Sequence, residues 1–140
     1  MRLALRSIFA VLIAFVAASV IMMVIETING RVLHPELAKA AEGVTDREAM
    51  RAIFARAPIS AFLVVIFAWI LGSFAGGWVA ARLAGRAPAA HALALGTLVT
   101  LAGIANNLML PPPAWFWIAS LLFLLPAAHL GGRLVRKSPA

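Results

Sequence analysis

The chain of 140 residues is 64% hydrophobic and only 12% charged, with a mean hydropathy of +0.99. Apolar residues make up about half of a soluble domain, so this composition excludes a soluble globular protein and indicates a bilayer as the solvent. The net charge of +7 is spread over the ends of apolar runs, so we expect no nucleic-acid partner. Cysteine is absent, which excludes disulfides and thiolate metal sites.

The first predicted membrane span covers residues 8–28. Arg2 and Arg6 precede it, and as a helix it would rise about 31 Å, which matches the hydrocarbon core. A cleavable signal peptide is the alternative, because a basic start and the small residues 17–19 resemble a cleavage site. The apolar run continues through Ile25, beyond a normal signal core, so we predict an uncleaved first helix.

Residues 29–58 are the one long polar stretch, and they are predicted to lie outside the membrane. Pro35 predicts the start of a short helix and Gly43 its end. Thr45, with Glu48 three residues later, predicts a capping box that opens a second short helix. That second helix has an apolar face opposite a charged one, so we expect it to lie on the membrane surface.

The second predicted span, residues 59–83, carries small residues at every fourth position. Such a row lets a neighbouring helix approach closely. A second row of small residues runs beside the first, so this helix can pack on two neighbours. The predicted helix-packing face comprises Gly72, Gly76, Gly77 and Ala80.

The third and fourth spans are predicted at residues 89–110 and 114–134. Three consecutive prolines, residues 111–113, separate them by a tight turn. Trp115 and Trp117 place aromatic rings at the membrane interface, and Pro126 predicts a kink in the fourth span. We therefore predict a single all-α domain over residues 1–140, a bundle of four transmembrane helices with short helices outside the membrane in the first loop.

The charges that flank the spans predict the orientation. One side of the predicted bundle has seven basic residues and no acidic residue, whereas the other has five basic and four acidic residues. By the positive-inside rule the first side is cytoplasmic, so both termini are inside and residues 29–58 are outside. The seven basic residues are Arg2, Arg6, Arg82, Arg86, Arg133, Arg136 and Lys137.

Glu26 is the only acidic residue within an apolar run. Carboxylates in that position commonly serve ion or proton pathways. Because Glu26 lies roughly 12 Å from the middle of its helix, an interfacial carboxylate paired with Arg31 or Arg56 is the alternative. Asn106 and Asn107 end the third span at the same level, where interhelical hydrogen bonding is their alternative role. We predict a candidate polar pocket of Glu26, Asn106 and Asn107, suited to a small cation or polar molecule.

Two histidines raise the hypothesis of a haem or metal site, because His91 and His129 fall toward the same side on the third and fourth spans. Their depths differ and no carboxylate is near, so we predict no metal and no cofactor. His34 lies on the opposite side. The sequence also has no phosphate-binding glycine loop, no HExxH motif and no nucleophile with an adjacent base, which predicts that the protein is not an enzyme.

A local pattern follows the small residues of the second span. Gly76 to Arg86 reads Gly-Gly-Trp-Val-Ala-Ala-Arg-Leu-Ala-Gly-Arg, and His91 and Gly96 follow it. This pattern resembles one found in small bacterial four-helix membrane proteins to which no activity is assigned, and it implies a bacterial inner-membrane protein. The chain's size is also similar to that of small multidrug transporters and fluoride channels. Small multidrug transporters, however, have a deep glutamate and short loops, and fluoride channels commonly insert in both orientations.

The leading functional hypothesis from the sequence is a non-enzymatic membrane protein that acts through helix packing. Its partners would be the lipid bilayer and either further copies of itself or a larger membrane-protein complex that it serves as an accessory subunit. The alternative is a small transporter or channel whose site is the pocket around Glu26. A third hypothesis is a haem or metal protein that uses His91 and His129.

Overall fold

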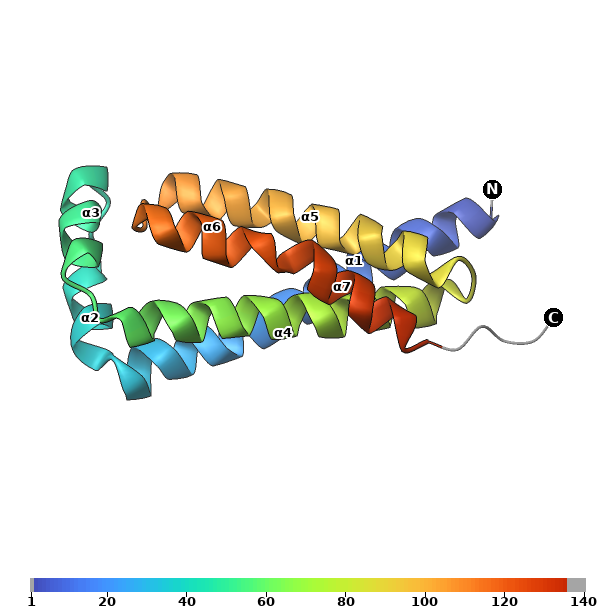
Figure 1. The fold of residues 1–140 in the computed structure, drawn as a ribbon, viewed down its shortest axis with the longest axis horizontal. Helices are drawn as coiled ribbons and strands as arrows, with labels where there is room; N and C mark the ends of the chain where they lie inside the picture. Colours follow the sequence, from blue (N-terminus) through green and yellow to red (C-terminus); the bar gives the residue numbers. More distant parts are fainter. Residues whose placement is uncertain (1, 136–140) are drawn as a thin grey trace.

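The computed structural model of the chain describes residues 2–135. Within that range every regular element is helical, and four helical stretches are long and apolar enough to cross a membrane (Figure 1). Arg136 and Lys137, two of the basic residues behind the predicted orientation, lie outside the described residues. The four stretches are Leu3–Leu33, Ile59–Ala84, Pro88–Met109 and Ala114–Arg133.

The first helix is longer than predicted, because α1 (Arg2–Ile28) continues into a π-helical turn, η1 (Asn29–Leu33). The buried side chain of Asn29 holds this extension against the start of the next long helix. Its Nδ2 donates to the carbonyl oxygen of Ala61 at 3.0 Å, and its Oδ1 accepts from Nδ1 of His34 at 2.7 Å. The polar loop is therefore shorter than residues 29–58.

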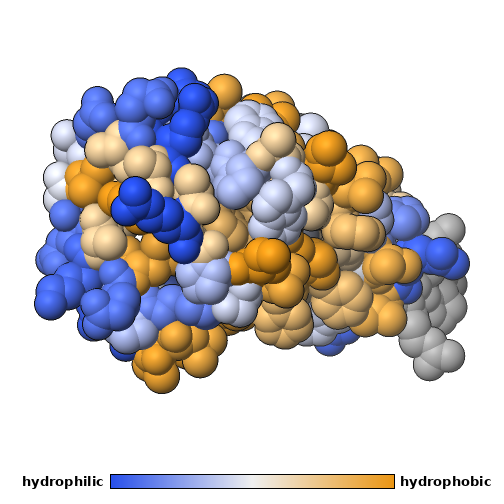
Figure 2. Space-filling model, turned by 60° about the vertical axis from the view of Figure 1, so that its left-hand side comes forward, coloured by the Kyte–Doolittle hydropathy of each residue, from blue (hydrophilic) through white to orange (hydrophobic). Residues whose placement is uncertain are grey.

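Two short helices cover the end of the bundle that lies away from the N-terminus (Figure 1). They are α2 (Pro35–Ala41) and α3 (Arg47–Ala55). Met50 of α3 is buried, and the ring of Phe54 lies edge-on to Phe62, with the centroids 5.8 Å apart. Part of the apolar face of α3 thus packs on the bundle. Figure 2 shows hydrophilic residues gathered over this end and apolar residues along the adjoining side of the bundle.

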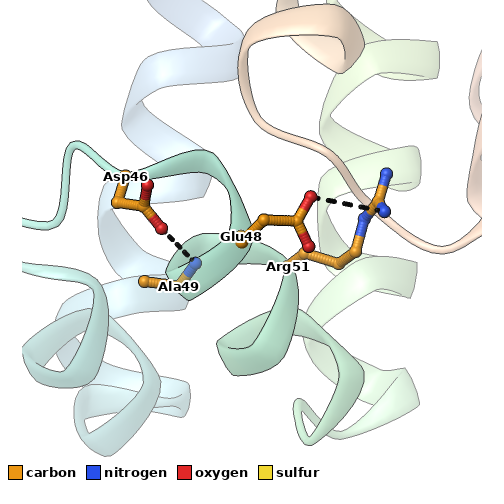
Figure 3. Close-up of polar contacts among 4 residues, drawn as sticks. All are labelled: Asp46, Glu48, Ala49 and Arg51. Atoms are coloured by element: carbon orange, nitrogen blue, oxygen red, sulfur yellow. Dashed lines mark hydrogen bonds and ion pairs between the residues drawn. The ribbon is translucent and has the colours of Figure 1, made fainter.

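The predicted capping box at the start of α3 is wrong in one residue. Asp46 is the N-cap, and its Oδ2 accepts from the backbone N–H of Ala49 at 2.8 Å (Figure 3). Glu48 does not complete a box with Thr45; it pairs with Arg51 at 3.6 Å. Aspartate caps a helix as well as threonine does, so the helix begins one residue later than Thr45 would require.

Asp46→Ala should therefore loosen α3, whereas Thr45→Ala should not. Loss of an N-cap costs roughly 1 kcal/mol, which would speed amide hydrogen exchange in α3 about fivefold. The measurement is hydrogen exchange across Arg47–Ala55, with Asp46→Asn as a variant that keeps an acceptor. Equal acceleration by Thr45→Ala and Asp46→Ala would contradict this assignment.

Prolines and a glycine set the ends of the central helices. α4 (Ile59–Ala84) starts after Pro58 and stops at Gly85, whose φ of +68° ends the helix in the left-handed region. α5 (Pro88–Met109) begins at Pro88, where the missing N–H has no helical partner to lose, and it ends before the three prolines. These bounds differ by one residue from the predicted spans.

The fourth stretch consists of two helices, α6 (Ala114–Leu122) and α7 (Leu124–Arg133), divided at Phe123. Pro126 explains the division. It has no N–H to donate to the carbonyl oxygen of Leu122, and its ring crowds that same carbonyl.

α4 is the central helix of the bundle, and one row of its small residues packs on α1. A Cβ at Gly72 would lie 2.7 Å from the side chain of Met22 and 2.9 Å from the carbonyl oxygen of Ala18. α1 presents small residues of its own to this contact, since Ala14 and Ala18 are fully buried. Small residues on both helices thus bring the two backbones close together.

The second row of α4 packs on α7. A Cβ at Gly77 would overlap the carbonyl oxygen of Ala128, and one at Gly131 would overlap that of Phe74. Ala80 is fully buried as well. The predicted helix-packing face of α4 is therefore occupied by the chain's own helices α1, α5 and α7.

Candidate functional site

A groove of about 480 Å³ is lined by α1 and α5 and by Trp69 of α4. Its size falls within the range of small-molecule sites. Most of its wall is apolar, and the polar side chains come from α1 and α5. We call it the Glu26 groove; its lining includes Phe15, Ser19, Met22, Met23, Glu26, Thr27, Val99 and Asn106.

The groove is chemically defined by the carboxylate of Glu26. Nε1 of Trp69 donates a hydrogen bond to its Oε1 at 2.7 Å. Trp69 is only 6% exposed, and its ring lies edge-on to Phe116, with the centroids 5.9 Å apart, so the donor is held in place by packing. Among residues 2–135, the second carboxylate oxygen has no hydrogen-bond partner. That oxygen can therefore accept a bond from a ligand in the groove.

The predicted alternative of an ion pair between Glu26 and Arg31 or Arg56 is wrong. Within the described part of the chain, no arginine nitrogen lies within 4.0 Å of the Glu26 carboxylate. Arg31 follows five residues later in the continuous helix and so points from another side of it. Arg56 is the C-cap residue of α3. The carboxylate is held by an indole N–H, and its charge is not neutralised by an arginine.

The two asparagines of the predicted pocket have separate positions. Consecutive helical residues point about 100° apart. Asn106 lines the Glu26 groove, so the structure brings it together with Glu26. Asn107 is fully buried, and its Nδ2 donates to Oγ of Ser120 at 3.3 Å. Asn107 thus makes the interhelical hydrogen bond between α5 and α6 that was the alternative for this residue.

Trp69 is a site residue that the sequence analysis does not single out. A signal for it does exist. Trp69 lies well inside an apolar helix, and a buried indole N–H needs an acceptor. Glu26 is the one carboxylate within the apolar runs. The pairing could have been inferred from these two facts together.

Hydrogen bonds within the protein hold two of the three histidines. Nδ1 of His91 donates to the carbonyl oxygen of Ala87 at 3.0 Å, and His34 belongs to the contact between η1 and α4. Nδ1 of His129 is buried and has no partner among the described residues. Over residues 2–135, no three histidine, aspartate or glutamate side chains are grouped as metal ligands.

Comparisons with protein-family models, curated proteins and solved structures find no match to this chain. The function is therefore argued from the groove itself. The stretch from Gly76 to Arg86, which resembles a pattern in small four-helix proteins, here forms helix contacts and the turn into α5.

Proposed function

We propose that this protein is a non-enzymatic bacterial inner-membrane protein and that it binds a small apolar organic cation in the Glu26 groove. The observation that carries the proposal is the Glu26 carboxylate, which is fixed by a buried tryptophan and open to a groove with apolar walls. Transport of such a cation is the activity that we propose this site to serve.

The membrane part of the proposal is supported by the four long apolar helices and by the distribution of charge. All five acidic residues of the chain lie between Glu26 and Glu48, toward the end covered by α2 and α3. The opposite end carries Arg6, Arg82 and Arg86 without an acidic residue. By the positive-inside rule this charge distribution favours cytoplasmic termini.

The cation is supported by the surroundings of the carboxylate. A charge beside apolar side chains is costly unless an opposite charge or hydrogen bonds compensate it. Trp69 supplies one hydrogen bond, and a cationic ligand would supply the missing charge. Met22 and Met23 line the groove with flexible, polarisable side chains that suit apolar bodies of different shapes. Asn106 adds an amide for polar substituents.

The extent of the groove supports transport. Phe15 lies at the middle of α1, whereas Asn106 lies near the end of α5 that is covered by α2 and α3. A ligand in the groove would therefore have a route from the middle of the long helices to one end of the bundle. Transporter sites lie near the bilayer midplane, which is the level that the Phe15 part of this groove reaches.

The binding test uses two ions of the same shape and opposite charge, tetraphenylphosphonium and tetraphenylborate. Titration of the purified protein by calorimetry should give at least about tenfold tighter binding of the phosphonium, because an ion pair in a partly buried site contributes more than about 1.4 kcal/mol. Equal binding of the two ions would contradict the proposed site.

Trp69→Phe should weaken phosphonium binding by about tenfold. The substitution keeps an aromatic ring against Phe116 but removes the N–H, and a hydrogen bond to a charged group contributes about 1.5 kcal/mol or more. Trp78→Phe is the matched control, since Trp78 lies on the same helix and does not line the groove. If both variants bind like the unmodified protein, the indole does not position Glu26.

An assembly subunit is the second candidate, and the outer face of α1 favours it. Leu12, Val16 and Val20 are each about half exposed along one side of this helix. A partner would pack there, because the small-residue rows of α4 are already filled. Native mass spectrometry of protein extracted mildly from its own membrane separates the candidates. A stoichiometric partner or a homo-oligomer supports assembly, and a monomer with bound cation supports the groove.

A further inference from the structure

Two arginines join α1 to the last turn of α4 and to the connection between α4 and α5, at the end of the bundle opposite α2 and α3. Nε of Arg6 donates to the carbonyl oxygen of Leu83 at 3.0 Å, and Nη2 of Arg86 donates to Oγ of Ser7 at 3.1 Å. Both arginines are exposed. Each bond uses one of the five N–H groups of a guanidinium, so further donors on both side chains remain available.

Gly85, which ends α4, lies close to the guanidinium of Arg6. Its φ is +68°, and a Cβ there would lie only 2.7 Å from Nη2 of Arg6. The guanidinium of Arg6 therefore lies directly against the backbone of the turn. Arg6 and Arg86 are thus held at one junction by different elements of the fold.

A second groove, of about 370 Å³, begins beside this junction and lies between α1 and α5. Ser7, which accepts the bond from Arg86, is one of its lining residues. Apart from His91, the rest of the wall is apolar, and no acidic side chain, arginine or lysine is among the residues that line it. We call it the Ser7 groove; its apolar lining consists of Ile8, Val11, Leu12, Ala90 and Ala94.

The electrostatic surroundings of the junction favour an anion. No acidic residue occurs in the chain before Glu26 or after Glu48. α5 also begins next to Arg86, and the N-terminus of this 22-residue helix adds a partial positive charge. An anionic head beside the arginines and an apolar chain in the groove would complement both parts of the surface.

We propose that Arg6 and Arg86 bind the phosphate of an anionic phospholipid and that the Ser7 groove takes one of its acyl chains. The inference rests on the membrane part of the proposed function and is independent of the Glu26 groove. It agrees with the proposed orientation, because anionic lipids attract basic residues at the cytoplasmic surface.

The test is native mass spectrometry of the detergent-solubilised protein with added dioleoyl phosphatidylglycerol or dioleoyl phosphatidylcholine. We expect the protein to retain phosphatidylglycerol at about tenfold lower lipid concentration. Arg6→Gln combined with Arg86→Gln should abolish this preference. The control removes the same charge at the other end of the bundle, with Arg47→Gln and Arg56→Gln, and should keep it. Equal retention of the two lipids, or equal loss in both double variants, would overturn the proposal.

Two further arms distinguish a lipid from a free anion and from a folding defect. Ala94→Leu fills the Ser7 groove from an exposed position and leaves both arginines in place. It should reduce phosphatidylglycerol retention several-fold even if the arginine double variant fails to fold. Millimolar inorganic phosphate should leave the lipid bound. Displacement by inorganic phosphate, with no effect of Ala94→Leu, would show a free phosphate site and overturn the lipid assignment.

Discussion

Glu26→Gln is expected to lower the affinity for tetraphenylphosphonium by about 100-fold, which corresponds to about 2.7 kcal/mol. The amide has the same size as the carboxylate, and its oxygen can still accept the bond from Trp69, so the groove should keep its shape. What disappears is the negative charge beside the apolar wall. Beside apolar side chains its attraction to a cation is stronger than in bulk water. Calorimetric titration of the variant measures the loss.

The matched control for that variant is Glu36→Gln. Glu36 lies in the first turn of α2, does not line the Glu26 groove, and carries the same charge. It should leave phosphonium affinity within about twofold of the unmodified protein, since exposed charges at a distance are screened by salt. If Glu36→Gln weakens binding as much as Glu26→Gln does, attraction by overall charge explains the binding and the groove does not.

Gly77→Ala should destabilise the bundle by about 3 kcal/mol, the upper end of the range for overpacking. The new methyl group would overlap the carbonyl oxygen of Ala128, and a backbone atom cannot move away as a side chain can. α4 and α7 would have to separate. Unfolding in increasing mole fraction of sodium dodecyl sulfate, followed by circular dichroism, measures the effect.

The same contact can be tested from the opposite helix. Gly131→Ala should act like Gly77→Ala, because its methyl group would overlap the carbonyl oxygen of Phe74. The double variant should lose less than the sum of the two, since either substitution alone already separates α4 from α7. Gly30→Ala is the control, because its Cβ would meet only the side chain of Ala38, at 3.4 Å. A full loss in Gly30→Ala would show that added side-chain volume has a general effect.

The helices could be predicted from the sequence because apolar runs between prolines and glycines define them locally. Pro58, Gly85 and Pro88 set helix ends through their own backbone geometry, without help from distant residues. The extension through Asn29 could not be predicted in this way. It depends on hydrogen bonds from that side chain to Ala61 and His34, and Ala61 is 32 residues away in the chain.

The partners of the small-residue rows were beyond local inference for a related reason. Spacing every fourth residue on α4 predicts a close helix contact, but the same spacing serves a neighbouring helix of one chain and a second copy equally well. Ala18 and Ala128 show which case applies, because they fill the space over Gly72 and Gly77. The surface of α4 on which the predicted oligomer contact depended is therefore covered by other helices of the same chain.

Which residues share the candidate site depends on the direction in which each side chain points around its helix axis. Depth along the helices predicts Glu26 and Asn106 at one level, and both line one groove in the structure. Depth could not separate Asn106 from Asn107, which differ by one residue and face different neighbours. It also could not reveal Trp69, which reaches Glu26 from 43 residues away.

The most direct test of the Glu26 groove is photoaffinity labelling of the protein in lipid nanodiscs with a benzophenone-substituted triarylphosphonium. The account predicts cross-links in α1 and α5, at lining residues such as Met22, Met23 and Ala102, and their loss in Glu26→Gln. Labels concentrated instead around Phe54 and Trp117, in the cavity beneath α3, and unchanged in Glu26→Gln would contradict it.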